Sequence, residues 1–162
     1  MMKASRFQYR RRVTFAETDL AGIMHFSNFL RWMEEAEHAF YRSLGLSVHP
    51  VQHGFPDTET GWPRVRVSAE YFRPLQFEEE AEVEVLVAEM RTKALRLAFR
   101  IWKSPDHSAA RELAAAGEFV VVAVRALPGT REMKSVPIPE AFRERIESVP
   151  AEALELPVAK RA

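Results

Sequence analysis

One stretch of the chain has the spacing of an amphipathic helix, and it lies among segments that alternate like β-strands. From Phe26 to Leu44, apolar residues recur every three or four positions and charged residues occupy the opposite side. This spacing predicts a helix of about five turns with one apolar face. Ser27 or Asn28 is the expected N-cap, and Gly45 is the expected end of the helix. A single helix of this kind must bury its apolar face against a sheet.

Strand patterns occur on both sides of this helix. Apolar and polar residues alternate in residues 7–15, 65–71, 81–87 and 95–101. Residues 118–127 are almost continuously apolar, which predicts a central strand packed on both faces or an interface strand. Residues 91–93 and 104–108 are expected turns, and residues 45–63 are an expected long connection rich in glycine and proline.

This order of elements predicts an α+β domain in which the helix lies on the concave face of a curved antiparallel sheet. The other sheet face would still carry apolar residues, so we expect a homo-oligomer. A length of 162 residues suits one domain. We expect that domain to span residues 1–148, with a short helix in residues 137–146 and a C-terminal tail in residues 149–162.

The composition excludes several classes of function. The 23 Lys and Arg residues balance 23 Asp and Glu residues, so the broad positive field of a nucleic-acid-binding protein is absent. There is no cysteine, which excludes disulfides, thiolate metal sites and a cysteine nucleophile. No apolar run has the length of a membrane span or the position of a signal peptide, so we predict no membrane partner and a cytoplasmic protein.

The segment between the first strand and the helix holds the candidate chemistry. Glu17, Asp19, Gly22 and His25 lie there within nine residues. A helix N-terminus presents unpaired amides that can stabilise an oxyanion, and a nearby carboxylate can act as a base or nucleophile. The residues alone leave open a plain turn in which Asp19 caps and Gly22 permits the bend. The histidine spacing does not indicate a metal site.

Residues 19–32, Asp-Leu-Ala-Gly-Ile-Met-His-Phe-Ser-Asn-Phe-Leu-Arg-Trp, resemble the signature of the 4-hydroxybenzoyl-CoA thioesterase branch of the hotdog-fold acyl-CoA thioesterases. Residues 71–80, 89–93 and 134–139 resemble later segments of that family in the same order. The resemblance therefore covers roughly residues 7–146. It implies the hotdog fold, in which a five-stranded antiparallel sheet wraps a long central helix. It also implies dimers that join their sheets edge to edge and often pair into tetramers.

The resemblance further implies hydrolysis of an acyl-CoA to free CoA and a carboxylic acid, without a metal or redox cofactor. The acyl group would be aromatic, or short to medium in length. Asp19 would act as nucleophile or general base, and the backbone amide of Phe26 would bind the thioester carbonyl oxygen. Gly22 and Ile23 would shape the loop against the acyl group. His25 stands where members of the family carry Tyr or Trp, which leaves three roles for it: lining the acyl pocket, bonding the substrate, or packing alone. Of these we predict that it lines the acyl pocket.

The CoA phosphates need a local basic patch, because the chain has no net charge. Arg91 and Lys93 lie in the turn that resembles the family's nucleotide-contacting hairpin, so both are candidate substrate-binding residues. We therefore expect acyl-CoA as the partner of the site.

Other hotdog functions give the alternatives. A non-catalytic module that binds acyl-CoA or acyl carrier protein would not need a carboxylate at Asp19. A dehydratase would need a His/Asp pair early in the helix, and residues 27–31 contain none. The variant with a histidine seven positions after the aspartate does not fit either, because Phe26 stands there. A thioesterase that releases a polyketide from a carrier protein uses the same scaffold and is left open by these residues.

Overall fold

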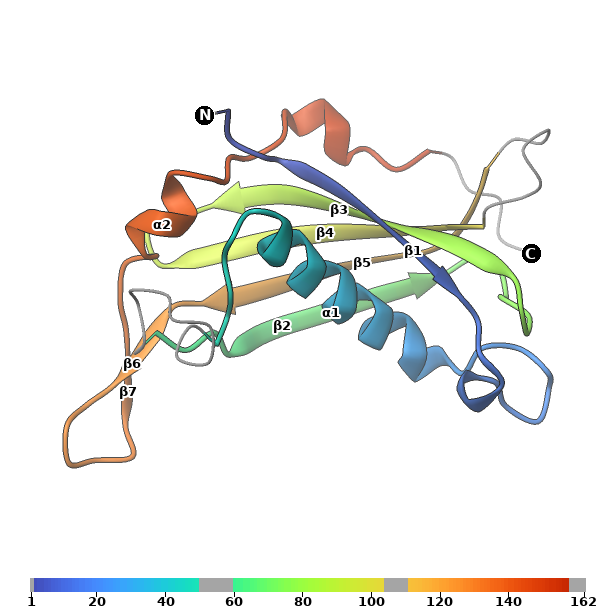
Figure 1. The fold of residues 1–162 in the computed structure, drawn as a ribbon, viewed down its shortest axis with the longest axis horizontal. Coiled ribbons are helices and arrows are strands. Elements are labelled where there is room, and N and C mark those ends of the chain that lie inside the picture. Colours follow the sequence, from blue (N-terminus) through green and yellow to red (C-terminus); the bar gives the residue numbers. More distant parts are fainter. Residues whose placement is uncertain (1, 50–59, 104–110, 158–162) are drawn as a thin grey trace.

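Five antiparallel strands form a curved sheet with one long helix across one face (Figure 1). The computed structural model describes residues 2–49, 60–103 and 111–157. The elements of the main layer are β1 (Arg6–Arg12), α1 (Phe26–Ser43), β2 (Arg64–Tyr71), β3 (Glu80–Met90), β4 (Ala94–Lys103) and β5 (Glu112–Val122). The spatial order of the strands is β1-β3-β4-β5-β2, which leaves β1 and β2 at the edges. The expected helix wrapped by a five-stranded antiparallel sheet is confirmed. No helix in these ranges is long and apolar enough to span a membrane.

The predicted apolar face of α1 forms the centre of the core. It buries Phe29, Trp32, Met33, Ala36 and Phe40 against the sheet, where the facing residues include Val85, Leu97, Phe99 and Phe119. The Met33 side chain of α1 lies directly over Gly117 of β5, where an added Cβ would lie 2.8 Å from the Met33 sulfur and 2.6 Å from the Ser68 carbonyl oxygen. A side chain at position 117 would therefore push α1 or β2 away.

The chain leaves α1 and enters the β3–β4 hairpin as the sequence predicts. Gly45 ends the helix with a φ of +69°, a backbone conformation that favours glycine. Residues 91–93 form the hairpin tip, where the Arg91 amide donates to the Ala94 carbonyl over 2.8 Å. Residues 104–108 and most of the connection between α1 and β2 lie outside the described residues.

The apolar run of residues 118–127 is not one strand, which corrects the prediction. Its first part belongs to β5, an interior strand between β4 and β2. The chain departs from β4 after Ala123, whose amide donates to Lys93 and whose carbonyl accepts from Val136. The next residues form β6 (Val124–Ala126), which pairs with β7 (Met133–Ser135). These long-range bonds divide a segment whose composition is uniform.

After residue 146, the C-terminal residues cross the outer face of the sheet, opposite α1. Helix α2 (Glu140–Arg143) is shorter than the segment expected to be helical. Beyond it, the Val149 amide donates to Val87 over 2.8 Å. The 3-10 helix η3 (Ala151–Leu154) follows, and Arg100 donates to the carbonyls of Ala153 (2.6 Å) and Glu155 (3.0 Å).

Candidate active site

The loop between β1 and α1 is a closed turn that presents Asp19 at the surface. The Asp19 amide donates to the Ile23 carbonyl over 2.9 Å, and the Gly22 amide donates to the Asp19 carbonyl over 3.0 Å. Gly22 has a φ of +79°, so glycine is the residue suited to this bend. The Asp19 Oδ1 atom accepts from the Ala21 amide over 2.8 Å. Asp19 Oδ2 has no hydrogen-bond partner among the described residues, so this oxygen is open to a substrate or water.

The start of α1 differs in one respect from the prediction. The helix begins at Phe26 as expected, but its N-cap is His25 and not Ser27 or Asn28. His25 Nδ1 accepts from the Ser27 amide over 3.3 Å and lies 2.8 Å from the Ser27 hydroxyl. The Asn28 amide donates to the His25 carbonyl. Within the described chain nothing accepts from the Phe26 amide, which is thus a free donor at the positive end of the helix dipole.

A pocket of about 500 Å³ is lined by both Asp19 and Phe26. Its lining consists of Asp19, Ile23, Met24, Phe26, Phe29, Tyr71, Phe72, Arg73 and Pro74. Three of the predicted site residues, Asp19, Ile23 and Phe26, therefore meet in one apolar hollow. Gly22 shapes the adjoining turn. His25 was expected to line this pocket, but its ring caps α1 and stacks on Phe26, with centroids 4.4 Å apart.

The second wall of the pocket comes from the end of β2 and was not expected as a site. Tyr71 donates its hydroxyl proton to the Phe26 carbonyl over 3.1 Å and packs edge-on against Phe29. Burial raises the pKa of Tyr71 above its ordinary value, so the phenol keeps this proton at neutral pH. The only sequence signal for this wall is the aromatic pair, Tyr71 and Phe72, at the end of an alternating segment.

Arg91 and Lys93 lie at the opposite end of the sheet from Asp19. The loop of Asp19 follows Arg12, which pairs with Glu80 at the start of β3. The hairpin follows the other end of β3. The 11 residues of β3 extend about 35 Å at about 3.3 Å per residue. Arg91 forms an ion pair with Glu89 at 2.9 Å. One copy of the chain therefore does not bring these basic residues to the pocket.

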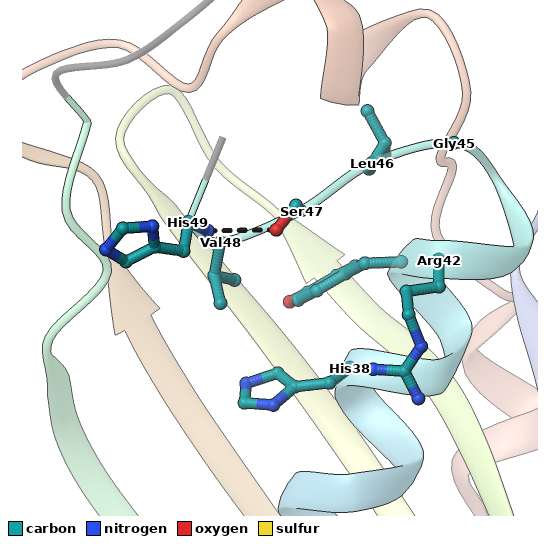
Figure 2. A pocket seen from close by; sticks show the side chains of 8 residues that line it. His38, Arg42, Gly45, Leu46, Ser47, Val48 and His49 are labelled. Atoms are coloured by element: carbon teal, nitrogen blue, oxygen red, sulfur yellow. Dashed lines mark hydrogen bonds between the residues drawn. The ribbon is translucent and has the colours of Figure 1, made fainter. Parts of the chain in front are cut away.

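A second hollow of about 530 Å³ lies at the C-terminal half of α1 (Figure 2). Figure 2 shows His38 and Arg42 on the helix and Ser47, Val48 and His49 on the segment that follows it. The described lining of this hollow includes neither Asp19 nor the N-terminus of α1, so it is separate from the candidate active site. Among the described residues, no group of three His, Asp or Glu side chains is placed to hold a metal ion.

Comparison with known proteins agrees with this geometry. The family profile described as the thioesterase-like superfamily matches residues 13–146. The match covers most of the chain, and the chain therefore belongs to the thioesterase-like superfamily.

Individual relatives carry related activities in their names. A putative esterase of Aquifex aeolicus is 34% identical over 99 residues, which are 60% of this chain and 73% of that protein. A 1,4-dihydroxy-2-naphthoyl-CoA hydrolase of Gloeothece citriformis is 31% identical over 107 residues, 65% of this chain and 73% of that protein.

The fold is also that of a solved thioesterase. The structure of 4-hydroxybenzoyl-CoA thioesterase from Pseudomonas sp. strain CBS-3 superposes with a TM-score of 0.71. It is 21% identical and covers 87% of this chain and 99% of that one, a likeness that concerns the fold alone. The hotdog fold expected from residues 19–32 is confirmed. The expected class of enzyme, a thioester hydrolase, is confirmed by the family.

Proposed function

We propose that the chain hydrolyses an acyl-CoA thioester, with Asp19 and the Phe26 amide as its reacting groups. The observation that carries this proposal is that Asp19 and Phe26 line one apolar pocket, while Asp19 Oδ2 and the Phe26 amide are both unpaired among the described residues. A donor at a helix N-terminus stabilises the negative charge that develops on a thioester oxygen under attack.

Asp19 has two ways to use this geometry. As a general base, it takes a proton from the water molecule that attacks the carbonyl carbon; the C–S bond then breaks and CoA leaves as a thiol. As a nucleophile, it forms a mixed anhydride and expels CoA, and water then cleaves the anhydride. Both routes consume one water molecule and give one carboxylic acid and one free thiol. Both use only the chain's own residues and water, so no cofactor is required.

The pocket lining favours an aromatic acyl group. Four aromatic residues, Phe26, Phe29, Tyr71 and Phe72, line the hollow beside Asp19, and aromatic rings pack well against one another in edge-on or offset arrangements. The names of the relatives, which include hydrolases of a dihydroxynaphthoyl-CoA, support the same class. A short or medium aliphatic chain is the alternative that a substrate panel would separate.

The open edge of β2 supports assembly through this strand. Among the described strands, β2 pairs on one side only, and Val65 and Val67 are 62% and 43% exposed. Antiparallel pairing of two β2 strands about a two-fold axis gives a closed dimer. This pairing would place the β3–β4 hairpin of one copy at the same end as Asp19 of the other. We propose that Arg91 and Lys93 meet the CoA phosphates in this way, in a dimer or in a tetramer built from dimers.

A thiol-release assay over a panel of aromatic and aliphatic acyl-CoAs tests the function. We expect hydrolysis by the wild type and a loss of about 100-fold or more in kcat for Asp19→Asn, which keeps the side-chain volume and the Oδ1 acceptor. A wild type that binds CoA esters without hydrolysing them would identify a binding module. The same assay with thioesters of acyl carrier protein tests the other alternative. Hydrolysis of these thioesters alone would show that the substrate is bound to a carrier protein and not to CoA. Full activity of Asp19→Asn would refute the assignment of Asp19.

A further inference from the structure

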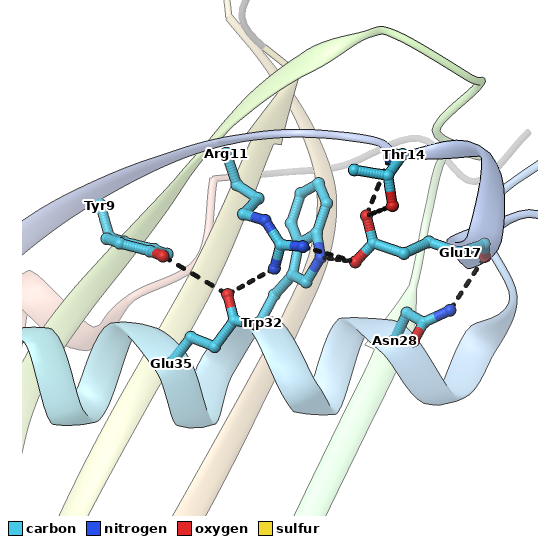
Figure 3. A network of polar contacts seen from close by, with 7 residues as sticks. All are labelled: Tyr9, Arg11, Thr14, Glu17, Asn28, Trp32 and Glu35. Atoms are coloured by element: carbon cyan, nitrogen blue, oxygen red, sulfur yellow. Dashed lines mark hydrogen bonds and ion pairs between the residues drawn. The ribbon is translucent and has the colours of Figure 1, made fainter.

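The carboxylate of Glu17 is the centre of a polar network that joins β1, the loop of Asp19 and α1 (Figure 3). Its Oε1 atom accepts from the amide and the hydroxyl of Thr14, each over 2.9 Å. Its Oε2 atom accepts from Trp32 Nε1 over 2.6 Å and from Arg11 Nη2 over 3.1 Å. Both oxygens are occupied and only 12% of the side chain is exposed. Glu17 therefore holds these residues together and has no free oxygen with which to act as a base.

The charge of Glu17 is also fixed by these contacts. Burial acts to raise the pKa of Glu17, but the hydrogen bonds from Thr14 and Trp32 and the charge of Arg11 outweigh it and hold the pKa below its ordinary value. Arg11 is held in turn by Glu35 on α1, which also accepts from the Tyr9 hydroxyl over 3.4 Å. The Glu17 carboxyl group is thus ionised at neutral pH, and Glu35 of α1 holds the Arg11 guanidinium beside it.

The main chain of Glu17 binds the beginning of the same helix. The Glu17 carbonyl accepts from the His25 amide over 2.8 Å and from Asn28 Nδ2 over 2.9 Å. His25 directly precedes Phe26, so the base of the loop is bonded to the residue beside the free amide. The side chain and the main chain of one residue therefore hold the loop to two consecutive turns of α1.

The closed turn above this base carries Asp19. The turn is bonded internally between Asp19 and Ile23 and bridged between Thr18 and Met24. It is held on one side by Glu17 and on the other by Leu75, whose carbonyl accepts from the Met24 amide over 2.7 Å. A displacement of about 1 Å in a reacting group can cost about 100-fold in rate. Of these two attachments, only that of Glu17 ties the turn directly to the N-terminus of α1, so its contacts help to set where Asp19 lies relative to Phe26.

We propose that Glu17 is a positioning residue for hydrolysis, which acts by fixing the Asp19 turn on the N-terminus of α1. This inference rests on the proposed function of Asp19. Glu17→Gln tests it. Glutamine has an NH₂ group in place of one carboxylate oxygen, and this group cannot accept the hydrogen bonds that the oxygen accepted. We expect kcat to fall about 10- to 100-fold, while KM for the acyl-CoA changes less than about threefold because no substrate contact is removed.

Glu35→Gln is the matched control. It removes the second negative charge beside Arg11 but keeps a side-chain oxygen that can accept from Arg11, and Glu35 itself bonds only to Tyr9 and Arg11 of β1. We therefore expect kcat close to that of the wild type. Trp32→Phe is a second variant, which removes the 2.6 Å hydrogen bond but keeps an aromatic ring, and should lower kcat about three- to tenfold at similar KM. A loss of kcat in Glu35→Gln as large as in Glu17→Gln would overturn the proposal. So would an unchanged kcat in folded Trp32→Phe and Glu17→Gln.

A double-variant cycle with Asp19→Asn separates this proposal from the proposed function. If Glu17 acts through Asp19, Glu17→Gln will reduce the residual rate of Asp19→Asn by less than about twofold. Additive losses would show that Glu17 acts independently of Asp19 and would overturn the proposal. If Asp19→Asn alone keeps full activity, the proposed function of Asp19 fails. If Asp19→Asn is inactive and Glu17→Gln is normal, only the positioning role fails.

Discussion

The Tyr71 hydroxyl donates a hydrogen bond to the Phe26 carbonyl across 3.1 Å, which joins the end of the edge strand β2 to the first residue of α1. The same ring lies edge-on to Phe29, with centroids 5.1 Å apart. Tyr71 therefore contacts both the residue whose amide is proposed to bind the thioester oxygen and an aromatic wall of the pocket. One side chain links the reacting end of the pocket to its acyl end.

Tyr71→Phe should lower kcat by about three- to tenfold with little change in KM, because it removes one hydrogen bond and retains the ring. Tyr71→Ala should also change the preference among acyl groups, since the pocket loses a wall. Steady-state kinetics over an acyl-CoA panel measures both effects. Equal behaviour of the two variants would show that the ring contributes nothing to acyl recognition.

His25 supplies the N-cap of α1 through Nδ1. His25→Ala should lower the free energy of unfolding by about 1 kcal/mol, the ordinary cost of losing a cap. Asparagine is among the most favourable caps, so His25→Asn should retain most of the stability. Urea unfolding of both variants measures the difference. Equal losses in the two variants would mean that the ring's contact with Phe26, and not the cap, is what stabilises this end of the helix.

Gly117 leaves room for the Met33 side chain of α1 and for the backbone of β2, since an added Cβ would lie 2.8 Å from the Met33 sulfur and 2.6 Å from the Ser68 carbonyl oxygen. Gly117→Ala should therefore lower the free energy of unfolding by about 1–3 kcal/mol through overpacking. In a Met33→Ala background the same change should cost less, because one of the two clashing groups is gone. Thermal or urea unfolding checks this, and equal costs in both backgrounds would contradict the close approach to Met33.

Much of the fold follows from local patterns in the sequence. The apolar spacing and Gly45 predict a helix over residues 26–44, and α1 covers Phe26–Ser43. Alternation predicts β3 and β4 and the hairpin between them, because the side-chain period of a strand is a local property. The reactive loop is similarly local, since Asp19, Gly22 and Phe26 lie within eight positions and the turn closes on itself.

The features that escape prediction depend on contacts between distant segments. The apolar run of residues 118–127 divides at Ala123 because Lys93 and Val136 bond there, and no local pattern marks that point. The wall formed by Tyr71 depends on which strand end meets the loop, a property of strand order. His25 displaces the better capping residue Ser27 because the Glu17 carbonyl binds the His25 amide and fixes where the helix starts.

Replacement of Arg91 and Lys93 by alanine together should raise KM for acyl-CoA by about tenfold and leave kcat nearly unchanged, because these residues are proposed to bind the CoA phosphates and not the thioester group that reacts. The matched control is a pantetheine thioester of the same acyl group, which lacks the nucleotide. Its kinetics should be the same for the wild type and the double variant. An equal effect on both substrates would indicate that the hairpin acts on folding or assembly.

The carboxyl group of Glu37 is buried on α1, with 1% of the residue exposed. The Tyr41 hydroxyl donates to Oε2 over 3.0 Å, Arg64 Nη2 donates to Oε1, and His38 Nε2 lies 3.7 Å from Oε1. Burial raises the pKa of Glu37 to about 7, although Arg64 and Tyr41 favour the ionised form. The neighbouring carboxylate of Glu34 raises this pKa further.

An unfolded glutamate releases its proton near pH 4.5, whereas Glu37 in the folded chain holds it to about pH 7. Its contribution to stability is therefore full below pH 4.5 and is lost as the pH rises through 7, by about 3 kcal/mol. Glu37→Gln lacks this titration. His38, whose pKa is lowered chiefly by burial, titrates in both proteins. The quantity to measure is the unfolding free energy of the wild type minus that of Glu37→Gln, in urea from pH 4.5 to 8. This difference should fall between pH 4.5 and about 7 and then level off. A pH-independent difference would mean that Arg64 keeps Glu37 ionised throughout.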